Sequence, residues 1–223
     1  MTGITVNIEQ GIATITLGEQ TTFNPAVREA FADAIKTVKD SEEAQVLLLT
    51  GTGKNFCQGL DLEFLGSSTP DDIFEHVNRC MLEVAELMTL GVPTVSLING
   101  HAFGLGAMLV MACDYAAMRT ERGFFCLPEV NLNMALIPSM NSLVTESLSR
   151  KALRECLFTG TRVVAERAVE LEIVDQSCDV DQLRETGLAL ATPMMGKDKP
   201  TLAKLKQDAH HIVLDAIYAD APK

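Results

Sequence analysis

Two segments of similar design could stabilise an oxygen atom that gains negative charge during a reaction. In residues 45–65 and in residues 94–114, an apolar run predicted to be a buried strand leads into a glycine-containing turn and then a predicted helix. Glycine allows a tight turn and a close approach of ligand to backbone, and the first N–H groups of a helix lack intrahelical acceptors. Two such N–H groups that converge on one oxygen would form an oxyanion hole.

The residue spacing does not match the motifs of a nucleotide site or a zinc site. A phosphate-binding P-loop around residues 51–54 would need glycine at Leu48 and a hydroxyl residue at Asn55. A dinucleotide fingerprint starting at Gly104 would need its third glycine at Leu109. The four histidines have no zinc-ligand spacing. The turns are therefore interpreted as backbone donors and not as nucleotide or metal sites.

The elements that must position these turns follow from apolar periodicity and capping residues. Alternation in residues 4–8 and 12–17 predicts a hairpin, and buried strands are expected at 45–50, 93–98, 115–118 and 124–125. Asn24 and Thr69, each followed by proline, are expected to begin helices. The inward face of the second helix is expected to hold Ile73, Phe74, Val77, Met81, Val84, Leu87 and Met88. The chain after Pro138 is expected to be mainly helical.

Composition limits the class of protein. The 223 residues are 47% hydrophobic and 22% charged, which is typical of a folded protein of about one domain, and the succession of predicted strands and helices indicates an α/β fold. The net charge of −12 argues against a nucleic-acid or anionic-membrane surface, and no apolar run approaches the roughly 20 residues of a membrane span. The six scattered cysteines are expected to be reduced core residues. With no targeting signal recognised, a cytoplasmic location is expected, or a mitochondrial or peroxisomal one in a eukaryote.

Three ordered motifs resemble the crotonase, or enoyl-CoA hydratase/isomerase, superfamily. They are Asn55–Leu62 (NFCQGLDL), Asn99–Gly106 (NGHAFGLG) continuing to Cys113-Asp114, and Gly123–Val130 (GFFCLPEV). The likeness extends from the N-terminal hairpin to residues 173–175. It implies an α/β spiral of ββα units over residues 1–175, with a short helical C-terminal region, 176–223, in the same domain. It also implies an acyl-CoA thioester substrate, no separate cofactor or metal, and a homotrimer.

The resemblance also implies roles for individual residues. Leu60 and Leu105 would supply the two backbone N–H groups to the thioester oxygen, and Glu129 matches the family's catalytic carboxylate. An apolar pocket around this carboxylate would raise its pKa and make it a better base. Substrate contacts are expected from Ala26, Gln58, Gly59, Asp61, Leu62, Gly104, Met108, Leu127 and Met134, with Leu136 also in the pocket wall.

One departure from the family pattern bears on the reaction. Family hydratases carry a second glutamate where this chain has Met108. A single carboxylate suits a Δ3 to Δ2 double-bond shift, and the chain looks most like the single-glutamate Δ3,Δ2-enoyl-CoA isomerases. Alternatives are a hydratase or thioester hydrolase that recruits Glu63 or Glu75, and a non-catalytic acyl-CoA binder or interaction protein. Asp61 and Asp114 are expected to be structural, and Lys204 and Lys206 to be solvated.

Overall fold

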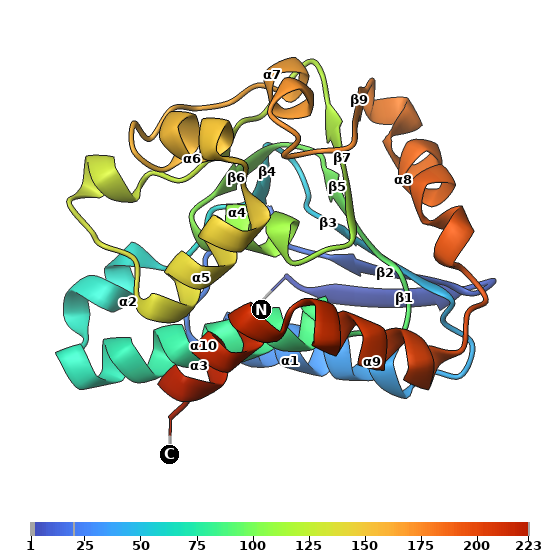
Figure 1. The fold of residues 1–223 in the computed structure, drawn as a ribbon, viewed down its shortest axis with the longest axis horizontal. Helices are drawn as coiled ribbons and strands as arrows, with labels where there is room; N and C mark the ends of the chain where they lie inside the picture. Colours follow the sequence, from blue (N-terminus) through green and yellow to red (C-terminus); the bar gives the residue numbers. More distant parts are fainter. Residues whose placement is uncertain (1–2, 20, 223) are drawn as a thin grey trace.

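Two β-sheets organise the chain in the computed structural model, which describes residues 3–19 and 21–222 (Figure 1). Within these residues the larger sheet has the strand order β1-β2-β3-β5-β7-β9 and the smaller one the order β4-β6-β8. The larger sheet consists of β1 (Thr5–Glu9), β2 (Ile12–Thr16), β3 (Val46–Thr50), β5 (Thr94–Ile98), β7 (Tyr115–Arg119) and β9 (Gln176–Cys178). The smaller sheet consists of β4 (Asn55–Cys57), β6 (His101–Phe103) and β8 (Phe125–Cys126).

The two sheets are built by a repeating unit. A strand of the larger sheet is followed by a strand of the smaller sheet and then by a helix, first in β3-β4-α2 (Leu62–Ser67 in α2) and next in β5-β6-α4 (Leu105–Met111 in α4). In the third unit, β7-β8, the helix is a 3₁₀ turn, Glu129–Leu132. Apart from the antiparallel β1–β2 hairpin, these pairings are parallel. The expected α/β spiral of ββα units and the hairpin are confirmed.

The first long helices begin where their capping residues predict. In α1 (Pro25–Asp40) the Asn24 side chain accepts a hydrogen bond from Val27 N–H, and in α3 (Pro70–Met88) Thr69 accepts one from Asp72 N–H. The prediction that Phe74 faces inward is wrong, because its side chain is 53% exposed. No residue of α3 before His76 is fully buried, although Ile73 is partly buried and packs against the core as predicted.

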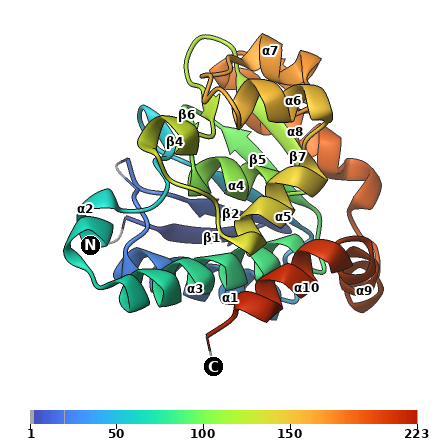
Figure 2. The same ribbon diagram turned by 60° about the vertical axis from the view of Figure 1, so that its left-hand side comes forward.

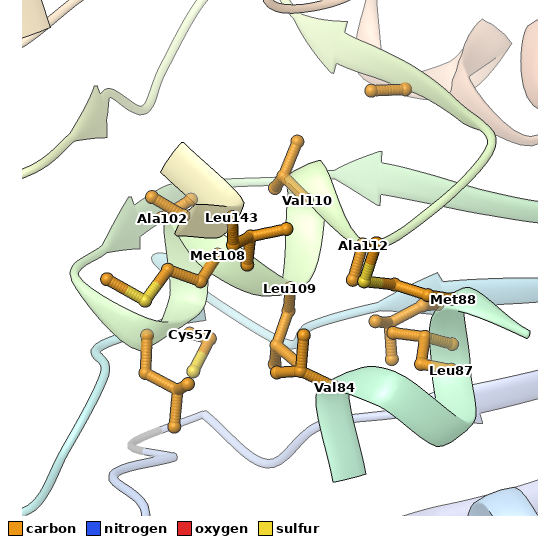
Figure 3. Close-up of a cluster of buried hydrophobic side chains, with 14 of the residues drawn as sticks. Cys57, Val84, Leu87, Met88, Ala102, Met108, Leu109, Val110, Ala112 and Leu143 are labelled. Atoms are coloured by element: carbon orange, nitrogen blue, oxygen red, sulfur yellow. The ribbon is translucent and has the colours of Figure 1, made fainter. Parts of the chain in front are cut away.

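The core lies on both faces of the larger sheet. On one face α4 is almost entirely buried, and Figure 3 shows Met108, Leu109 and Val110 projecting from it among side chains of neighbouring elements. On the other face α8 (Leu183–Ala191) packs against β5 and β7. That second cluster contains Val46, Leu48, Val95, Leu97, Ala117, Leu183 and Ala191. The larger sheet is therefore covered on both sides, as expected for parallel strands.

The later part of the chain wraps around this core. It contains α5 (Pro138–Ser147), α6 (Arg150–Cys156), α7 (Ala165–Glu170), α9 (Lys199–Ala209), α10 (His211–Asp220) and the short 3₁₀ turns Val180–Gln182 and Thr192–Met194. Helix α10 packs against α5 and α3, as Figure 2 shows. The sequence missed β9, whose three residues pair with β7 and are too short for a periodic signal. The division of the chain after residue 175 stays a prediction.

One charged residue lies inside the fold against expectation. The predicted solvated Lys206 is only 5% exposed. Its Nζ donates hydrogen bonds to Val92 O (2.9 Å) and to Asp114 Oδ2 (2.6 Å). Asp114 also accepts from the N–H and hydroxyl of Thr94, so its predicted structural role is confirmed. This ion pair fixes the C-terminal helices to the start of β5.

Two further expectations concern membranes and cysteines. None of the helices in the described residues is long and apolar enough to cross a membrane. All six cysteines are free thiols, and four of them are buried, as predicted.

Candidate active site

The three residues given chemical roles lie at equivalent places in the three repeats. Leu60, Leu105 and Glu129 each follow a strand of the smaller sheet by two or three residues. Because β4, β6 and β8 are parallel neighbours, their carboxyl ends meet at one edge of that sheet. All three residues line one cavity of about 460 Å³. The fold therefore brings together positions that are 69 residues apart in the sequence.

The two glycine turns are in direct contact. Gly59 has a φ of +87°, and a Cβ atom at this position would lie 2.7 Å from Phe103 O and 3.3 Å from Leu105 N. Any side chain at residue 59 would thus collide with the second turn. Gly59 O accepts a hydrogen bond from Phe23 N–H (2.8 Å), which fixes the first turn to the start of α1.

The N–H groups after these turns remain available to a ligand. Asp61 N–H donates to Phe23 O (3.2 Å), whereas Leu60 N–H has no acceptor among the described residues. Leu105 is the first residue of α4, and its N–H has no intrahelical acceptor. The preceding Gly104 N–H donates to Cys126 O (3.0 Å), which connects the second turn to the strand before Glu129. Two unpaired backbone donors and one carboxylate therefore share a cavity.

Glu129 is held in surroundings that disfavour its charge. Its Oε1 lies 3.5 Å from the position that a Cβ atom would occupy at Gly104. Its Oε2 is buried and has no hydrogen-bond partner among the described residues. Burial raises the pKa of Glu129, and a hydrogen bond with its own backbone opposes the shift only in part. A carboxyl group with a raised pKa and a free oxygen is suited to accept and return a proton.

The cavity wall is mostly apolar. Met108, Met134 and Leu136 line it as predicted, and Gln58, Gly59, Leu62 and Gly104 line it as well. Ile73 and Val77, predicted on the inward face of α3, also line the cavity. Lining residues that the sequence did not indicate include Leu65, Phe103, Leu132, Met140 and Arg162. Glu129 and Arg162 are the two charged side chains in the part of this wall that the structure describes. Arg162 was missed because no local pattern connects it to Glu129; the bridge between Phe125 and Val163 brings it there.

Three predicted substrate contacts lie outside the cavity. Leu127 is fully buried in the core and does not line the cavity, so its assignment to the pocket is not supported. Ala26 is exposed on the first turn of α1. Asp61 caps α2 by accepting from Glu63 N–H and Phe64 N–H, and it also accepts from Thr22 and Asn24. These bonds lower the pKa of Asp61, which fits its predicted structural role.

Neither alternative acid reaches the cavity. Glu63 and Glu75 are exposed and are absent from the lining, and Glu75 pairs with Arg79. The side chain at the family's second acidic position, Met108, is 1% exposed and contributes only a thioether. Glu129 is thus the single carboxylate among the described residues that line the cavity.

The chain is similar in sequence and in fold to known proteins of one family. The family model for enoyl-CoA hydratase/isomerase matches residues 7–219. The chain is 28% identical to Arabidopsis thaliana peroxisomal enoyl-CoA delta isomerase 2, over 94% of this chain and 88% of that protein. It is 31% identical to enoyl-CoA delta isomerase 3 of the same plant, over 74% and 72% of the two chains. An apo structure of an enoyl-CoA isomerase from Mycobacterium tuberculosis has the same fold, with a TM-score of 0.87, 21% identity, and 98% and 96% of the chains covered.

Proposed function

The chain belongs to the enoyl-CoA hydratase/isomerase family, whose members act on acyl-CoA thioesters, and from this premise we propose that it is a Δ3,Δ2-enoyl-CoA isomerase. The observation that carries the proposal is the lone cavity carboxylate, Glu129, with one oxygen beside the second glycine turn and the other buried without a partner. The names of two relatives, both enoyl-CoA delta isomerases, support the same choice.

The proposed reaction needs one base and one oxyanion site. The thioester oxygen accepts hydrogen bonds from Leu60 N–H and Leu105 N–H. Glu129 removes a proton from C2, and the C–H electrons form a C1–C2 double bond while the carbonyl electrons move to oxygen, which gives a dienolate that keeps the C3–C4 double bond. Protonated Glu129 then delivers the proton to C4, which leaves the double bond between C2 and C3. The two N–H groups hold the charge that develops on oxygen, and each such donor is typically worth about 2.7–4 kcal/mol.

The alternatives receive less support from the same observations. Addition of water needs a group that activates the water as well as one that protonates carbon, and Met108, Glu63 and Glu75 do not supply one in the cavity. A protein that only binds acyl-CoA gains nothing from a buried carboxylate oxygen without a partner, which carries a desolvation penalty. If Glu129 is a catalytic base, the penalty has a function, because the same burial raises the pKa of the carboxyl group and makes it a better base near neutral pH.

Ultraviolet absorbance distinguishes these functions. We expect the protein to generate conjugated enoyl thioester from 3-enoyl-CoA, with little loss of conjugation from 2-enoyl-CoA. We expect Glu129→Gln to bind acyl-CoA and to lose about 10²–10⁴-fold in kcat. Glu63→Gln and Glu75→Gln are matched controls, since both glutamates are exposed and outside the cavity. Full activity of Glu129→Gln, or hydration as the main reaction, would overturn the proposal.

A further inference from the structure

The cavity contains a cation that the proposed isomerisation does not use. Arg162 lines the cavity, and no carboxylate among the described residues forms an ion pair with it. Its guanidinium carbon instead lies 5.6 Å from the centroid of the Phe103 ring and 5.9 Å from that of Phe124. Cation–π contacts of this kind hold an arginine in place and leave its N–H donors free.

The fold fixes Arg162 from two sides. Its neighbour Val163 exchanges two backbone hydrogen bonds with Phe125, both of 2.9 Å, so the backbone beside Arg162 is attached to β8. The two rings beneath the guanidinium are themselves stacked on His101, at centroid distances of 5.5 and 5.1 Å. Arg162 is itself exposed, and these contacts restrict where its donors can lie before any ligand arrives.

The local charge around this cluster is positive in an otherwise acidic protein. The pKa of His101 is lowered, first by burial and then by the charges of Arg162 and Arg122. With the net charge of the chain at −12, an anionic group is retained only where basic side chains gather locally. Arg162 is the member of this basic cluster that lines the cavity.

A methyl-ended acyl chain is a poor match for the part of the cavity wall that Arg162 forms. Packing it against the guanidinium would remove water from the charge without replacing the lost hydrogen bonds. A carboxylate can accept two parallel N–H bonds from the planar fork of an arginine, and these charge-assisted bonds are stronger than neutral ones. The cavity therefore has an apolar wall for methylene groups, a base, and a separate donor for an anionic terminus.

We propose that Arg162 determines substrate specificity by binding a carboxylate at the far end of the acyl chain, so that the preferred substrates are CoA thioesters of unsaturated dicarboxylic acids. The inference deepens the proposed isomerase function and rests on it for the reaction, but the binding of the terminal carboxylate is measurable without turnover. The same guanidinium could instead meet a phosphate of CoA, so the experiment must separate these two anions.

Calorimetry with unreactive saturated thioesters tests the proposal on the intact protein. Each CoA thioester with a carboxylate at the end of its acyl chain is paired with a methyl-ended thioester of equal chain length, for example adipoyl-CoA with hexanoyl-CoA. The pairs form a series of increasing chain length, from succinyl to sebacoyl. We expect the carboxylate-ended member to bind about 10-fold tighter or more at the length that reaches Arg162. Arg162→Met should abolish this ratio, and Arg162→Lys should retain part of it, since lysine keeps the charge but not the fork. Arg154→Met, which changes an exposed arginine outside both the cavity lining and this basic cluster, should keep the wild-type ratio.

The possible results separate the role proposed for Arg162 from the proposed isomerase function. A ratio near one at every chain length in the wild-type protein overturns the inference, whether or not the variants fold. An equal loss of affinity for both members of each pair in Arg162→Met also overturns it and assigns the arginine to a CoA phosphate; the corresponding pantetheine thioesters, which lack the nucleotide, check this. Turnover of 3-enoyl-CoA without a preference for the carboxylate-ended substrate leaves the isomerase function standing and removes only the specificity. A binding preference without isomerisation of any 3-enoyl-CoA removes the isomerase function and leaves the specificity.

Discussion

Glu129 and Gly104 are neighbours across the cavity: Glu129 Oε1 lies 3.5 Å from where a Cβ atom would stand at Gly104. Gly104 has φ +52° and ψ −116°, a conformation that only glycine adopts readily. The turn that exposes Leu105 N–H is therefore the same turn that makes room for the carboxylate. The carboxylate and the Leu105 N–H, which we propose as base and oxyanion donor, are placed by one local backbone geometry, and the predictions about Glu129 and Leu105 depend on it.

The activity should depend on pH through Glu129. Burial raises the pKa of this carboxyl group above its usual range, and only the ionised form accepts a proton. We expect kcat/KM for 3-enoyl-CoA to fall on the acidic side with a midpoint above that of an ordinary glutamate. A rate that stays constant down to pH values where free glutamate protonates would contradict the assignment of Glu129 as the base.

Glu129→Gln should stabilise the protein at neutral pH. Because the folded-state pKa is raised, the folded protein binds more protons than the unfolded chain, and ionisation destabilises the fold as pH rises above the unfolded-state value. Removing the charge should raise the free energy of unfolding by about 1 kcal/mol at pH 7. Urea unfolding at several pH values checks this: the gain should disappear under acidic conditions, where both states are protonated. An equal gain at all pH values would mean that burial of the charge is not its origin.

Leu105→Pro should remove one oxyanion donor. Proline lacks an N–H but is well tolerated at the first position of a helix, which Leu105 occupies in α4. Leu105→Ala is the matched control, because it shortens the same buried side chain and keeps the N–H. Relative to Leu105→Ala, we expect the proline variant to lose about 10²–10³-fold in kcat. Similar rates for the two variants, with similar thermal unfolding, would show that this N–H does not contact the thioester oxygen.

Lys206→Met should destabilise the fold without touching the cavity. The change leaves Asp114 largely buried without its cation, and breaking a buried pair typically costs about 3–5 kcal/mol. Adding Asp114→Asn should recover part of that loss, because the uncompensated charge is then absent. Chemical denaturation gives the free energy of unfolding of Lys206→Met, of Asp114→Asn and of the double variant. A double variant that loses the full sum of the two single changes would show that the residues are not coupled.

A trimer is the expected assembly. Several large apolar side chains of the single chain are exposed, including Phe158 at 65% and Leu205 at 61%, and burying such groups between subunits is favourable. Light scattering coupled to size exclusion should give three times the chain mass of 24.2 kDa. A mass equal to one chain at micromolar concentration would contradict this expectation.

The sequence by itself determined the features that depend on near neighbours. The caps of α1 and α3, the β1–β2 hairpin and the two glycine turns each rest on residues within a few positions of one another, where backbone sterics and local hydrogen bonds decide the structure. The resemblance of the three ordered motifs to a known family implied the ββα repeat, and with it the meeting of Leu60, Leu105 and Glu129. Their catalytic roles remain predictions.

The tertiary structure decided which side chains face water and which face a partner far along the chain. Lys206 was expected in solvent but pairs with Asp114, and Phe74 follows the helical period but extends beyond the core. Arg162 reaches the cavity through a single bridge between distant segments. A local pattern records the period of a helix or strand, whereas the energy of a buried charge depends on packing between elements that the pattern does not describe.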